Sequence, residues 1–369
     1  MAWRFRAAPE QRLVMAHGRL ESAWRVHGSV IVEKGVLYCT AGRSSFLDGG
    51  IFLYGLNPAT GQIVHQARLD TRQATREDAK DQKFSTAFHI EGARSDILVA
   101  EGGFIFLNQM KFTPDLKEVD TPYVVHAPED KKAGLDVADV DYVAPNPYLQ
   151  KGFDKAAALG VSRGHLGDRD VGLHMFTTGG FLEDSWFNRT FWMYAKTWPG
   201  FQIGHIAPKT GQLLVVGDQL TYAVQAYPTR NNHSPMFQIG AKGYLLTADK
   251  NDNEPMLDYR SWSRDKGMGF TRGAPPQWHQ WVPIRMRSMV LAGGHLFVAG
   301  PPDVLESEDP MAPFEGRKGM ILRALDAASG KSLAEHRMES APVFDGMSAS
   351  GGRLFVSLRS GDLVCFGGK

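Results

Sequence analysis

Apolar residues in this chain occur in short runs that are separated by glycine-containing turns. Residues 30–66 show the pattern in full: apolar runs begin at Ile31, Val36 and Ile51, and an Asn-Pro-Ala-Thr-Gly turn at 57–61 leads into a fourth run. Short runs bounded by Gly, Asn and Asp predict strands joined by tight turns. We therefore predict a four-stranded antiparallel sheet here, which needs neighbouring sheets because it cannot bury both of its faces alone.

The same sequence of strand, glycine turn and strand returns along the rest of the chain, while no segment shows sustained helical periodicity. The returning segments are residues 96–107, 211–225, 243–248, 287–299, 321–337 and 343–366. Repeats of a four-stranded sheet are typical of a β-propeller, in which radial stacking protects the sheet edges. We predict an all-β fold, a β-propeller of about six to eight four-stranded antiparallel blades.

The domain organisation follows from where this pattern is interrupted. We expect residues 1–369 to form a single propeller domain, in which residues 1–25 are the remnant of a preceding blade. Residues 111–170 are rich in proline and residues 250–280 lack a regular pattern, so both stretches are predicted to be irregular insertions.

One turn sequence recurs at the end of a strand, as an apolar residue, a short turn, and Thr or Ser before Gly. Its copies are residues 56–61 (LNPATG), 206–211 (IAPKTG) and 325–330 (LDAASG). Asn or Asp and Thr or Ser side chains bond the backbone of such a turn, and Gly accepts the positive φ that precedes the next strand.

These copies resemble the repeat of pyrroloquinoline-quinone-type propellers, whose blades carry an Asp-x-x-Thr-Gly-x-x-x-Trp sequence and a Gly-x-Leu/Val-Tyr/Phe-Val sequence. The second sequence is matched by residues 35–39 (GVLYC), 294–298 (GHLFV) and 352–356 (GRLFV). Trp3 stands where the family's blade-ending tryptophan is found, which suggests that the start of the first blade is missing. Residues 30–66, 181–186 and 299–303 are also similar to propeller segments of large uncharacterised planctomycete-type proteins.

The resemblance implies a ligand- or protein-binding scaffold, as in the outer-membrane assembly lipoprotein that shares the repeat. It also implies a periplasmic or extracellular location, although residues 1–6 (MAWRFR) are not a secretory signal. We predict no cofactor; pyrroloquinoline quinone and calcium are suggested by the resemblance alone. Quinone dehydrogenases of this type use a vicinal disulfide, and no two cysteines are adjacent here. Dehydrogenase activity is therefore disfavoured.

Charge and hydropathy narrow the classes of partner. Lys and Arg total 41 and Asp and Glu total 40, for a formal net charge of +1, so we expect no nucleic-acid partner. No apolar run reaches the roughly 18 residues of a membrane helix, so no transmembrane segment is predicted. Cys39 and Cys365 both fall in apolar runs and are interpreted as small buried side chains.

Propeller loops converge on one face, and several polar loop residues are candidates for a shared ligand site there. The candidates are Arg43, Asp48, Asp184, Trp186, Arg189, Arg285 and Arg287. The plainer alternative for the first two is an ion pair of Arg43 with Asp48 across their own turn. No metal site is predicted, because the spacing of residues 165–174 fits no zinc pattern.

Tryptophan faces suggest a second function, a polysaccharide lyase or hydrolase that binds a glycan. The residues in question are Trp186, Trp192, Trp198, Trp262, Trp278 and Trp281. Such an enzyme needs an acid or base, for which Asp184 and His279 are candidates. Packing between blades is the alternative role for these tryptophans.

Overall fold

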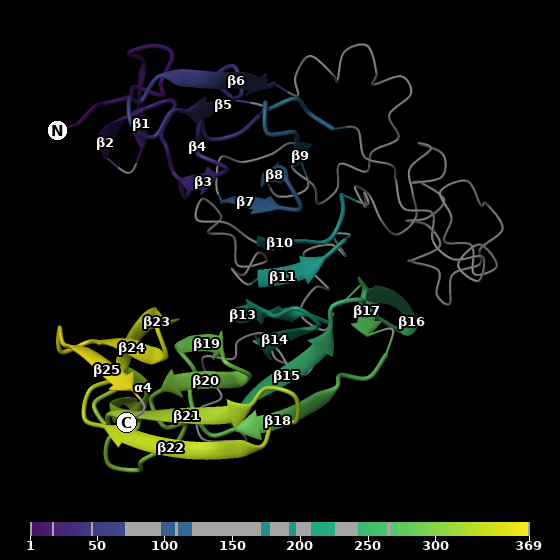
Figure 1. The fold of residues 1–369 in the computed structure, drawn as a ribbon, viewed down its shortest axis with the longest axis vertical. Helices are drawn as coiled ribbons and strands as arrows, with labels where there is room; N and C mark the ends of the chain where they lie inside the picture. Colours follow the sequence, from purple (N-terminus) through teal and green to yellow (C-terminus); the bar gives the residue numbers. More distant parts are fainter. Residues whose placement is uncertain are drawn as a thin grey trace. The chain divides into compact units, whose positions relative to one another are not determined.

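The computed structural model describes residues 2–16, 18–45, 47–70, 97–107, 110–119, 171–177, 192–196, 208–225, 243–263, 267–272 and 274–367. The chain divides into two compact units (Figure 1). The N-terminal unit comprises Met1–Thr190, Ala195–Gln202 and Ser261–Met268, and the C-terminal unit comprises Phe191–Tyr194, Ile203–Arg260 and Gly269–Lys369.

The N-terminal unit contains one complete four-stranded antiparallel sheet in the order β3-β4-β5-β6. Other strands precede and follow it in the sequence. The strands of this sheet are β3 (Ile31–Glu33), β4 (Val36–Ala41), β5 (Ile51–Leu56) and β6 (Ile63–Leu69). The others are the hairpin β1 (Leu13–Ala16) and β2 (Arg19–Ser22), the sheet β7 (Leu98–Glu101), β8 (Phe104–Leu107) and β9 (Met110–Phe112), and β10 (His174–Thr177).

Residues 30–66 form the four-stranded sheet that the sequence predicts, and they do so for local reasons. Lys34 and Gly35 both have positive φ, so a two-residue turn pairs Glu33 with Val36. The central strand β5 is buried on both faces, because Ile51 and Leu53 lie in one apolar cluster and Tyr54 lies in another. The sheet is therefore covered on its two sides, as a blade between neighbours requires.

The C-terminal unit repeats this sheet twice, in the orders β13-β14-β15-β18 and β19-β20-β21-β22, and adds a three-stranded sheet β23-β24-β25. The strands are β13 (Leu213–Val216), β14 (Leu220–Gln225), β15 (Tyr244–Lys250), β18 (Trp278–Val282), β19 (Ser288–Ala292), β20 (His295–Gly300), β21 (Met320–Asp326), β22 (Ser332–Met338), β23 (Pro342–Ser350), β24 (Arg353–Leu358) and β25 (Leu363–Gly367). The short helix α4 (Met311–Glu315) lies between β20 and β21.

The predicted fold class is confirmed: the described residues form an all-β chain of propeller type, built from four-stranded antiparallel blades. The stretch 250–280 differs from its prediction, because it contains the hairpin β16 (Pro255–Ser263) and β17 (Gly267–Arg272) and the start of β18. Most of the stretch 111–170 lies outside the described residues. The number of blades and the single domain stay predictions.

Two of the three turn copies form the turn that the sequence predicts. The side-chain oxygen of Asn57 accepts the Ala59 and Thr60 amides at 2.9 and 3.2 Å, and Gly61 has φ 71°. In the copy at residues 325–330, Asp326 accepts the Ser329 amide at 2.8 Å. Gly330 there has φ 73°, and a bond of 2.8 Å from its amide to the carbonyl of residue 326 closes the turn, as in the first copy.

The copy at residues 206–211 does not form the predicted turn, so the prediction for it is wrong. Thr210–Gly211 is a short strand, β12, that pairs with Trp192 and Met193 of β11 (Trp192–Ala195). The positive φ falls on Lys209, at 53°, and not on Gly211. This segment therefore continues into β13 instead of turning into an outer strand.

A glycine before the third strand of each complete blade is a structural repeat that the sequence analysis missed. Gly50, Gly243 and Gly319 all have positive φ, and a Cβ on each would lie 2.1 to 2.3 Å from a carbonyl oxygen of the outer strand. No side chain fits there without moving the backbone. These glycines let the outer strand pass close to the start of the third strand.

Tryptophans dock onto both regular turns. Nε1 of Trp3 donates to the Pro58 carbonyl at 2.9 Å, and a Cβ on Gly61 would meet the Trp3 ring at 2.5 Å. Nε1 of Trp278 donates in the same way to the Ala327 carbonyl at 2.9 Å. The indole of Trp278 covers Gly330 and links β18 to the next blade, so this tryptophan is a packing residue.

Candidate functional site

The first candidate residues, Arg43 and Asp48, lie in the loop between β4 and β5 and are paired with each other. Arg43 Nη2 lies 2.6 Å from Asp48 Oδ2, and Arg12 forms a second ion pair with the other oxygen of this carboxylate. Trp24 Nε1 donates to the Asp48 carbonyl at 2.9 Å, and the Asp48 side chain is only 7% exposed. Asp48 is therefore paired with Arg43 across their own turn, which is the plainer alternative from the sequence, and also with Arg12 from the segment before β1.

Arg285 and Arg287 lie on an extended segment that leads from β18 to β19. Buried residues alternate with them, because Ile284 and Met286 are 0% and 2% exposed. The backbone is fixed by bonds of 2.8 Å from the Arg285 amide to the Pro301 carbonyl and from the Arg287 amide to the Ala299 carbonyl. Since alternate residues of an extended segment point to the same side, both arginine side chains leave the segment together.

Both side chains meet the end of α4. Arg285 Nη1 donates to the Phe314 carbonyl at 2.7 Å, and its guanidinium carbon lies 3.5 Å from the Phe314 ring centroid. Arg287 Nη2 reaches the same carbonyl at 3.3 Å. Arg359, from the turn between β24 and β25, donates to the neighbouring carbonyl of Glu315. Arg285, Arg287 and Arg359 are hereafter called the arginine cluster.

The carboxylates near α4 are directed to other cations. Arg317 pairs with Asp309 and, at 2.8 Å, with Glu315, and Lys318 pairs with Glu306 at 3.0 Å. Within the described part of the chain, no carboxylate lies within ion-pair distance of the arginine cluster. The cluster is thus held by backbone carbonyls, while its neighbours neutralise one another.

The electrostatics of the arginine cluster reflect this arrangement. Burial lowers the pKa of Arg287, and the charges of Arg285 and Arg359 lower it further. Burial also lowers the pKa of Arg285, opposed by a hydrogen bond to Tyr244 and by the charge of Asp303. Burial raises the pKa of Tyr244, so its hydroxyl stays neutral near pH 7. The site is a positively charged, half-buried surface.

Sequence reasoning found Arg285 and Arg287 but missed Arg359. Arg359 follows β24, in a different sheet, and its amide bonds to the Ala341 carbonyl at 2.9 Å. No turn motif in the sequence marks Arg359, because its contact with the Glu315 carbonyl depends on how β24 packs beside α4. Arg43 and Asp48 belong to the N-terminal unit and the arginine cluster to the C-terminal unit. Asp184, Trp186 and Arg189 lie outside the described residues.

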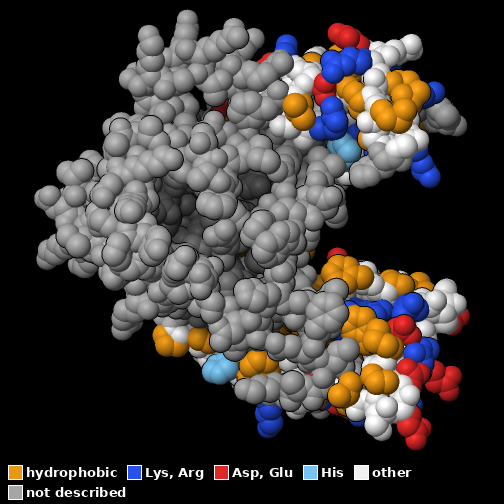
Figure 2. All heavy atoms as spheres, turned by 180° about the vertical axis from the view of Figure 1, so that it is seen from behind, with side chains coloured by type: hydrophobic (Ala, Val, Ile, Leu, Met, Phe, Trp, Pro, Cys, Tyr) orange, Lys and Arg blue, Asp and Glu red, His pale blue; other side chains and the backbone are white. Residues whose placement is uncertain are grey.

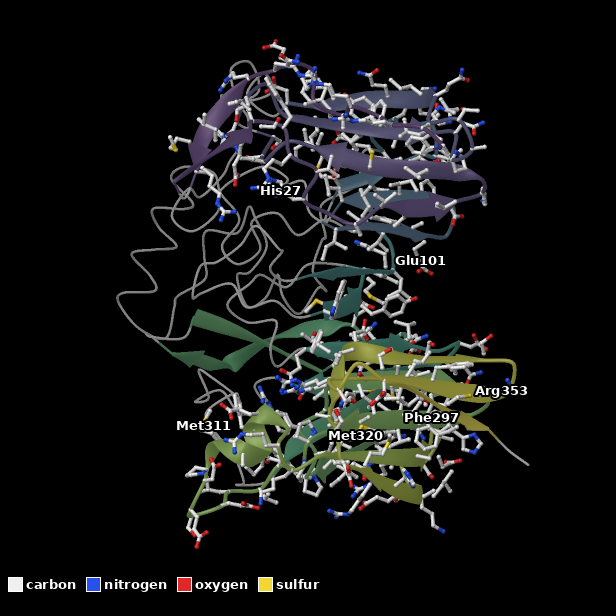
Figure 3. The ribbon with its side chains drawn as sticks, turned by 90° about the vertical axis from the view of Figure 1, so that its left-hand side faces the viewer. His27, Glu101, Phe297, Met311, Met320 and Arg353 are labelled. Carbon is white, nitrogen blue, oxygen red and sulfur yellow. The ribbon has the colours of Figure 1, made fainter. Side chains whose placement is uncertain are left out.

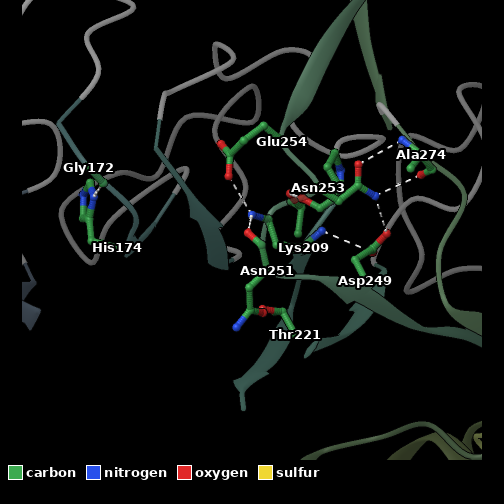
Figure 4. A network of polar contacts seen from close by, with 11 residues as sticks. Gly172, His174, Lys209, Thr221, Asp249, Asn251, Asn253, Glu254 and Ala274 are labelled. Carbon is green, nitrogen blue, oxygen red and sulfur yellow. Dashed lines mark hydrogen bonds and ion pairs between the residues drawn. The ribbon is translucent and has the colours of Figure 1, made fainter. Parts of the chain in front are cut away.

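A second polar cluster surrounds Lys209, whose side chain is fully buried (Figure 4). Its Nζ donates to the Asn251 carbonyl at 2.6 Å and to Glu254 Oε1 at 2.8 Å. Its backbone amide donates to Asp249 Oδ2 at 3.3 Å. Asn253 links the other oxygen of Asp249, at 3.2 Å, to the backbone of residue 274.

This cluster stabilises the turn after β15, and the Lys209 amine is not exposed for a reaction. Burial lowers the pKa of Lys209, while Glu254, Asp249 and Asp252 oppose the shift. A side chain with no exposed surface cannot reach a substrate in solution, and its hydrogen bonds hold it in place. We interpret Lys209 as the internal cation of the 249–254 turn. In the sequence, only the two carboxylates of residues 251–254 (NDNE) after β15 hint at such a cation.

The remaining tryptophan and histidine candidates differ in exposure. Trp278 is used in packing, whereas His279 and Trp281 lie on the opposite, exposed face of β18. Trp192 is half-buried on β11. Trp186, Trp198 and the Trp262 side chain lie outside the described residues. Among the described residues, no ion pair joins His279 to a carboxylate.

The cysteines do not fit the quinone site that the resemblance suggests. Cys39 and Cys365 are free thiols on β4 and β25, in different units. Cys39 is buried as predicted, and burial raises its pKa to about 11. Cys365 is exposed, contrary to the prediction, because it lies on the outer strand β25. Because neither thiol can form a vicinal disulfide, we derive no chemical step through a quinone.

The described surface mixes charged and apolar side chains (Figure 2). Leu13, Met15 and Leu20 of the hairpin β1-β2 are 56%, 69% and 65% exposed. Among the described residues, no helix has the length and apolar character needed to cross a lipid bilayer.

No protein-family model and no curated protein matches the chain. Among solved structures, BamB from Moraxella catarrhalis is similar at 8% identity and a TM-score of 0.34, over 91% of this chain and 70% of BamB. The quinohemoprotein alcohol dehydrogenase ADHIIG from Pseudomonas putida HK5 is similar at 12% identity and a TM-score of 0.31, over 90% of this chain and 62% of the dehydrogenase. A europium-containing methanol dehydrogenase is similar at 12% identity and a TM-score of 0.29, over 92% of this chain and 68% of that enzyme.

Proposed function

We propose that this chain is a non-catalytic, quinoprotein-like β-propeller that acts as a binding scaffold for a protein or glycan ligand, in the periplasm or outside the cell. The observation that carries the proposal is the difference between its charged clusters. Arg43 with Asp48, and Lys209 with Glu254, are closed by internal ion pairs. The arginine cluster alone, among those described above, presents charge without a carboxylate partner, which favours binding over proton transfer.

The geometry offers less support for a carbohydrate-active enzyme. General acid–base catalysis needs a group held within hydrogen-bond reach of the proton that it transfers. His279 is an exposed side chain on an outer strand, and the indole of Trp278 is already packed on the next blade. Trp281 is 40% exposed on the outer face of β18, and an indole that reaches the surface is compatible with a glycan ligand.

The test separates binding from chemistry. The purified chain is incubated with Glu-rich and Lys-rich peptides of equal length and with a polysaccharide panel, and binding and products are measured by fluorescence anisotropy and mass spectrometry. We expect saturable binding with unchanged ligands. Shortened or unsaturated sugars would contradict the proposal, as would dye reduction by the chain after addition of pyrroloquinoline quinone and calcium.

A further inference from the structure

The arginine cluster carries more positive charge than its surroundings balance. Its hydrogen-bond acceptors on α4 are the backbone carbonyls of Phe314 and Glu315, which carry only partial charges. Asp303, which is 6% exposed, contributes one negative charge near Arg285. Three guanidinium groups therefore face one nearby carboxylate, and the charges of Arg285 and Arg359 disfavour the charged form of Arg287.

Within this cluster, Arg287 and Arg359 each have one side-chain hydrogen bond, and that of Arg287 is long. A guanidinium carries five N–H donors in a fixed fork, and Arg287 uses one for a long bond of 3.3 Å to the Phe314 carbonyl. Its backbone is held on both sides, by the Ala299 carbonyl at 2.8 Å and by the Asp345 amide at 2.8 Å. The side chain is half-buried, so the remaining donors are fixed in place before a ligand arrives.

We infer that the arginine cluster binds an oxyanion, a carboxylate or phosphate group of the ligand. Arg287 and Arg359 donate to the oxyanion, and Arg285, fixed between Tyr244 and the Phe314 ring, supplies charge beneath it. Arginine suits this role because its fork matches the two oxygens of a carboxylate or phosphate. The inference rests on the proposed binding function and names the chemistry of one ligand group.

An exposed aromatic residue beside the cluster offers a way to distinguish the sources of that oxyanion. Phe344 is 65% exposed and precedes Asp345, whose amide bonds to the Arg287 carbonyl. An acidic peptide can pack an apolar side chain on Phe344, whereas inorganic phosphate cannot. Aromatic and arginine residues together are typical of the strongest contacts in protein interfaces.

The variants are Arg287→Met and Arg359→Met, with Arg353→Met as the matched control. Arg353 is exposed and begins β24, whereas Arg359 follows the end of this strand, so the control removes the same charge about 20 Å away. Figure 3 shows Arg353 at the opposite end of the C-terminal unit from Met311 of α4. Arg287→Lys keeps the charge without the fork, and it replaces Arg287→Met if that variant does not fold, as judged by circular dichroism.

The probes are a fluorescent Glu-rich peptide, its Gln-substituted form, and inorganic phosphate, which is compared with chloride at equal ionic strength by thermal shift. We expect the Glu-rich peptide to bind at least tenfold more weakly to Arg287→Met and Arg359→Met, and within twofold of wild type to Arg353→Met. If Phe344→Ala weakens binding of the peptide but leaves the thermal shift with phosphate as in wild type, the ligand is an acidic macromolecular segment. If Phe344→Ala leaves both as in wild type, the ligand is a small oxyanion.

Three results would overturn the inference: the same affinity for the Glu-rich and Gln-substituted peptides, an equal loss in Arg353→Met, or wild-type binding by Arg287→Met and Arg359→Met. In the last case the chain still binds the peptide, so the scaffold function stands and only the site is wrong. Chemical change of a ligand would instead contradict the scaffold function and leave the oxyanion site untouched.

Discussion

The blade β3-β4-β5-β6 and the blade β19-β20-β21-β22 share a set of backbone features, hereafter called the shared frame, but differ in one loop. Both have the same strand order, a positive-φ glycine before the third strand, a Thr-Gly or Ser-Gly turn after it, and a tryptophan docked on that turn. The loop between their second and third strands differs. In the first blade it spans residues 42–50 and pairs Arg43 with Asp48, whereas in the second it spans residues 301–319, contains α4 and meets the arginine cluster.

The comparison shows which constraints fix the frame and which leave room for function. Close backbone approaches and turn geometry tolerate few residues, so they repeat between the blades. The loop has no such constraint, because its chain runs over the surface between two fixed strand ends. Polar residues of the loop pair with one another in both blades, but the second loop also carries α4, whose backbone carbonyls accept bonds from the arginine cluster of other segments.

The largest expected effect tests the shared frame. Gly50→Ala and Gly319→Ala should each lower the free energy of unfolding by about 3–4 kcal/mol, because the new Cβ meets a backbone oxygen and φ is positive. Those oxygens, of Leu69 and Met338, lie 2.2 and 2.1 Å from the ideal Cβ positions. Gly351→Ala is the control, because its φ is also positive but nothing lies within 4 Å of the Cβ. Urea unfolding measures the free energy of unfolding of all three variants. An equal loss in Gly351→Ala would show that the close backbone approach at Gly50 and Gly319 does not matter.

A substitution of Lys209 tests the turn copy at residues 206–211, which departs from the shared frame. Lys209→Met should cost about 3 kcal/mol of unfolding free energy, because Glu254 and the turn after β15 lose a buried cation. Lys250→Met is the matched control, since Lys250 is an exposed lysine at the end of β15, next to the same turn. If both variants unfold at the same urea concentration, Lys209 does not fasten the turn.

The tryptophans test whether the two blades are joined to their neighbours alike. Trp3→Phe and Trp278→Phe remove an indole N–H that donates at 2.9 Å in each blade, and each should cost about 1–2 kcal/mol. We expect the larger loss at Trp278, because its bond is half-buried and that of Trp3 is exposed. Thermal unfolding of the two variants gives the order; a larger loss at Trp3 would reverse it.

Much of the shared frame could be predicted from the sequence because its causes are local. The turn at Asn57 and Gly61 depends on side chains two to four residues apart, and apolar runs mark strands directly. The glycine before the third strand was missed, although Gly-Ile, Gly-Tyr and Gly-Met at residues 50, 243 and 319 repeat the position. Its requirement is a carbonyl of another strand, which no local pattern reveals.

The candidate site was predictable only in part, for the same reason. Arg285 and Arg287 were selected as polar loop residues, but Arg359 comes from another sheet and the carbonyls that it meets are invisible in a sequence. The pairing of Arg43 with Asp48 was foreseeable, because the two lie five residues apart in one loop. The dependence on Lys209 was not, since its partners follow it by about forty residues.

The smallest expected effect separates the two turns by charge. Asp326 accepts bonds from Ser329, which lower the pKa of its carboxyl below its ordinary value, whereas Asn57 accepts the equivalent bonds without a charge. A lowered folded-state pKa stabilises the fold above the unfolded pKa, and this contribution is lost as the pH falls through the folded value.

The difference in unfolding free energy between wild type and Asp326→Asn should therefore shrink from pH 5 downwards. Asn57→Asp should introduce the same acid dependence in the first blade, measured by urea unfolding between pH 5 and the acid limit of the folded state. If Asn57→Asp shows none while Asp326→Asn removes it, the two turns are not equivalent and the shared frame does not extend to their hydrogen bonds.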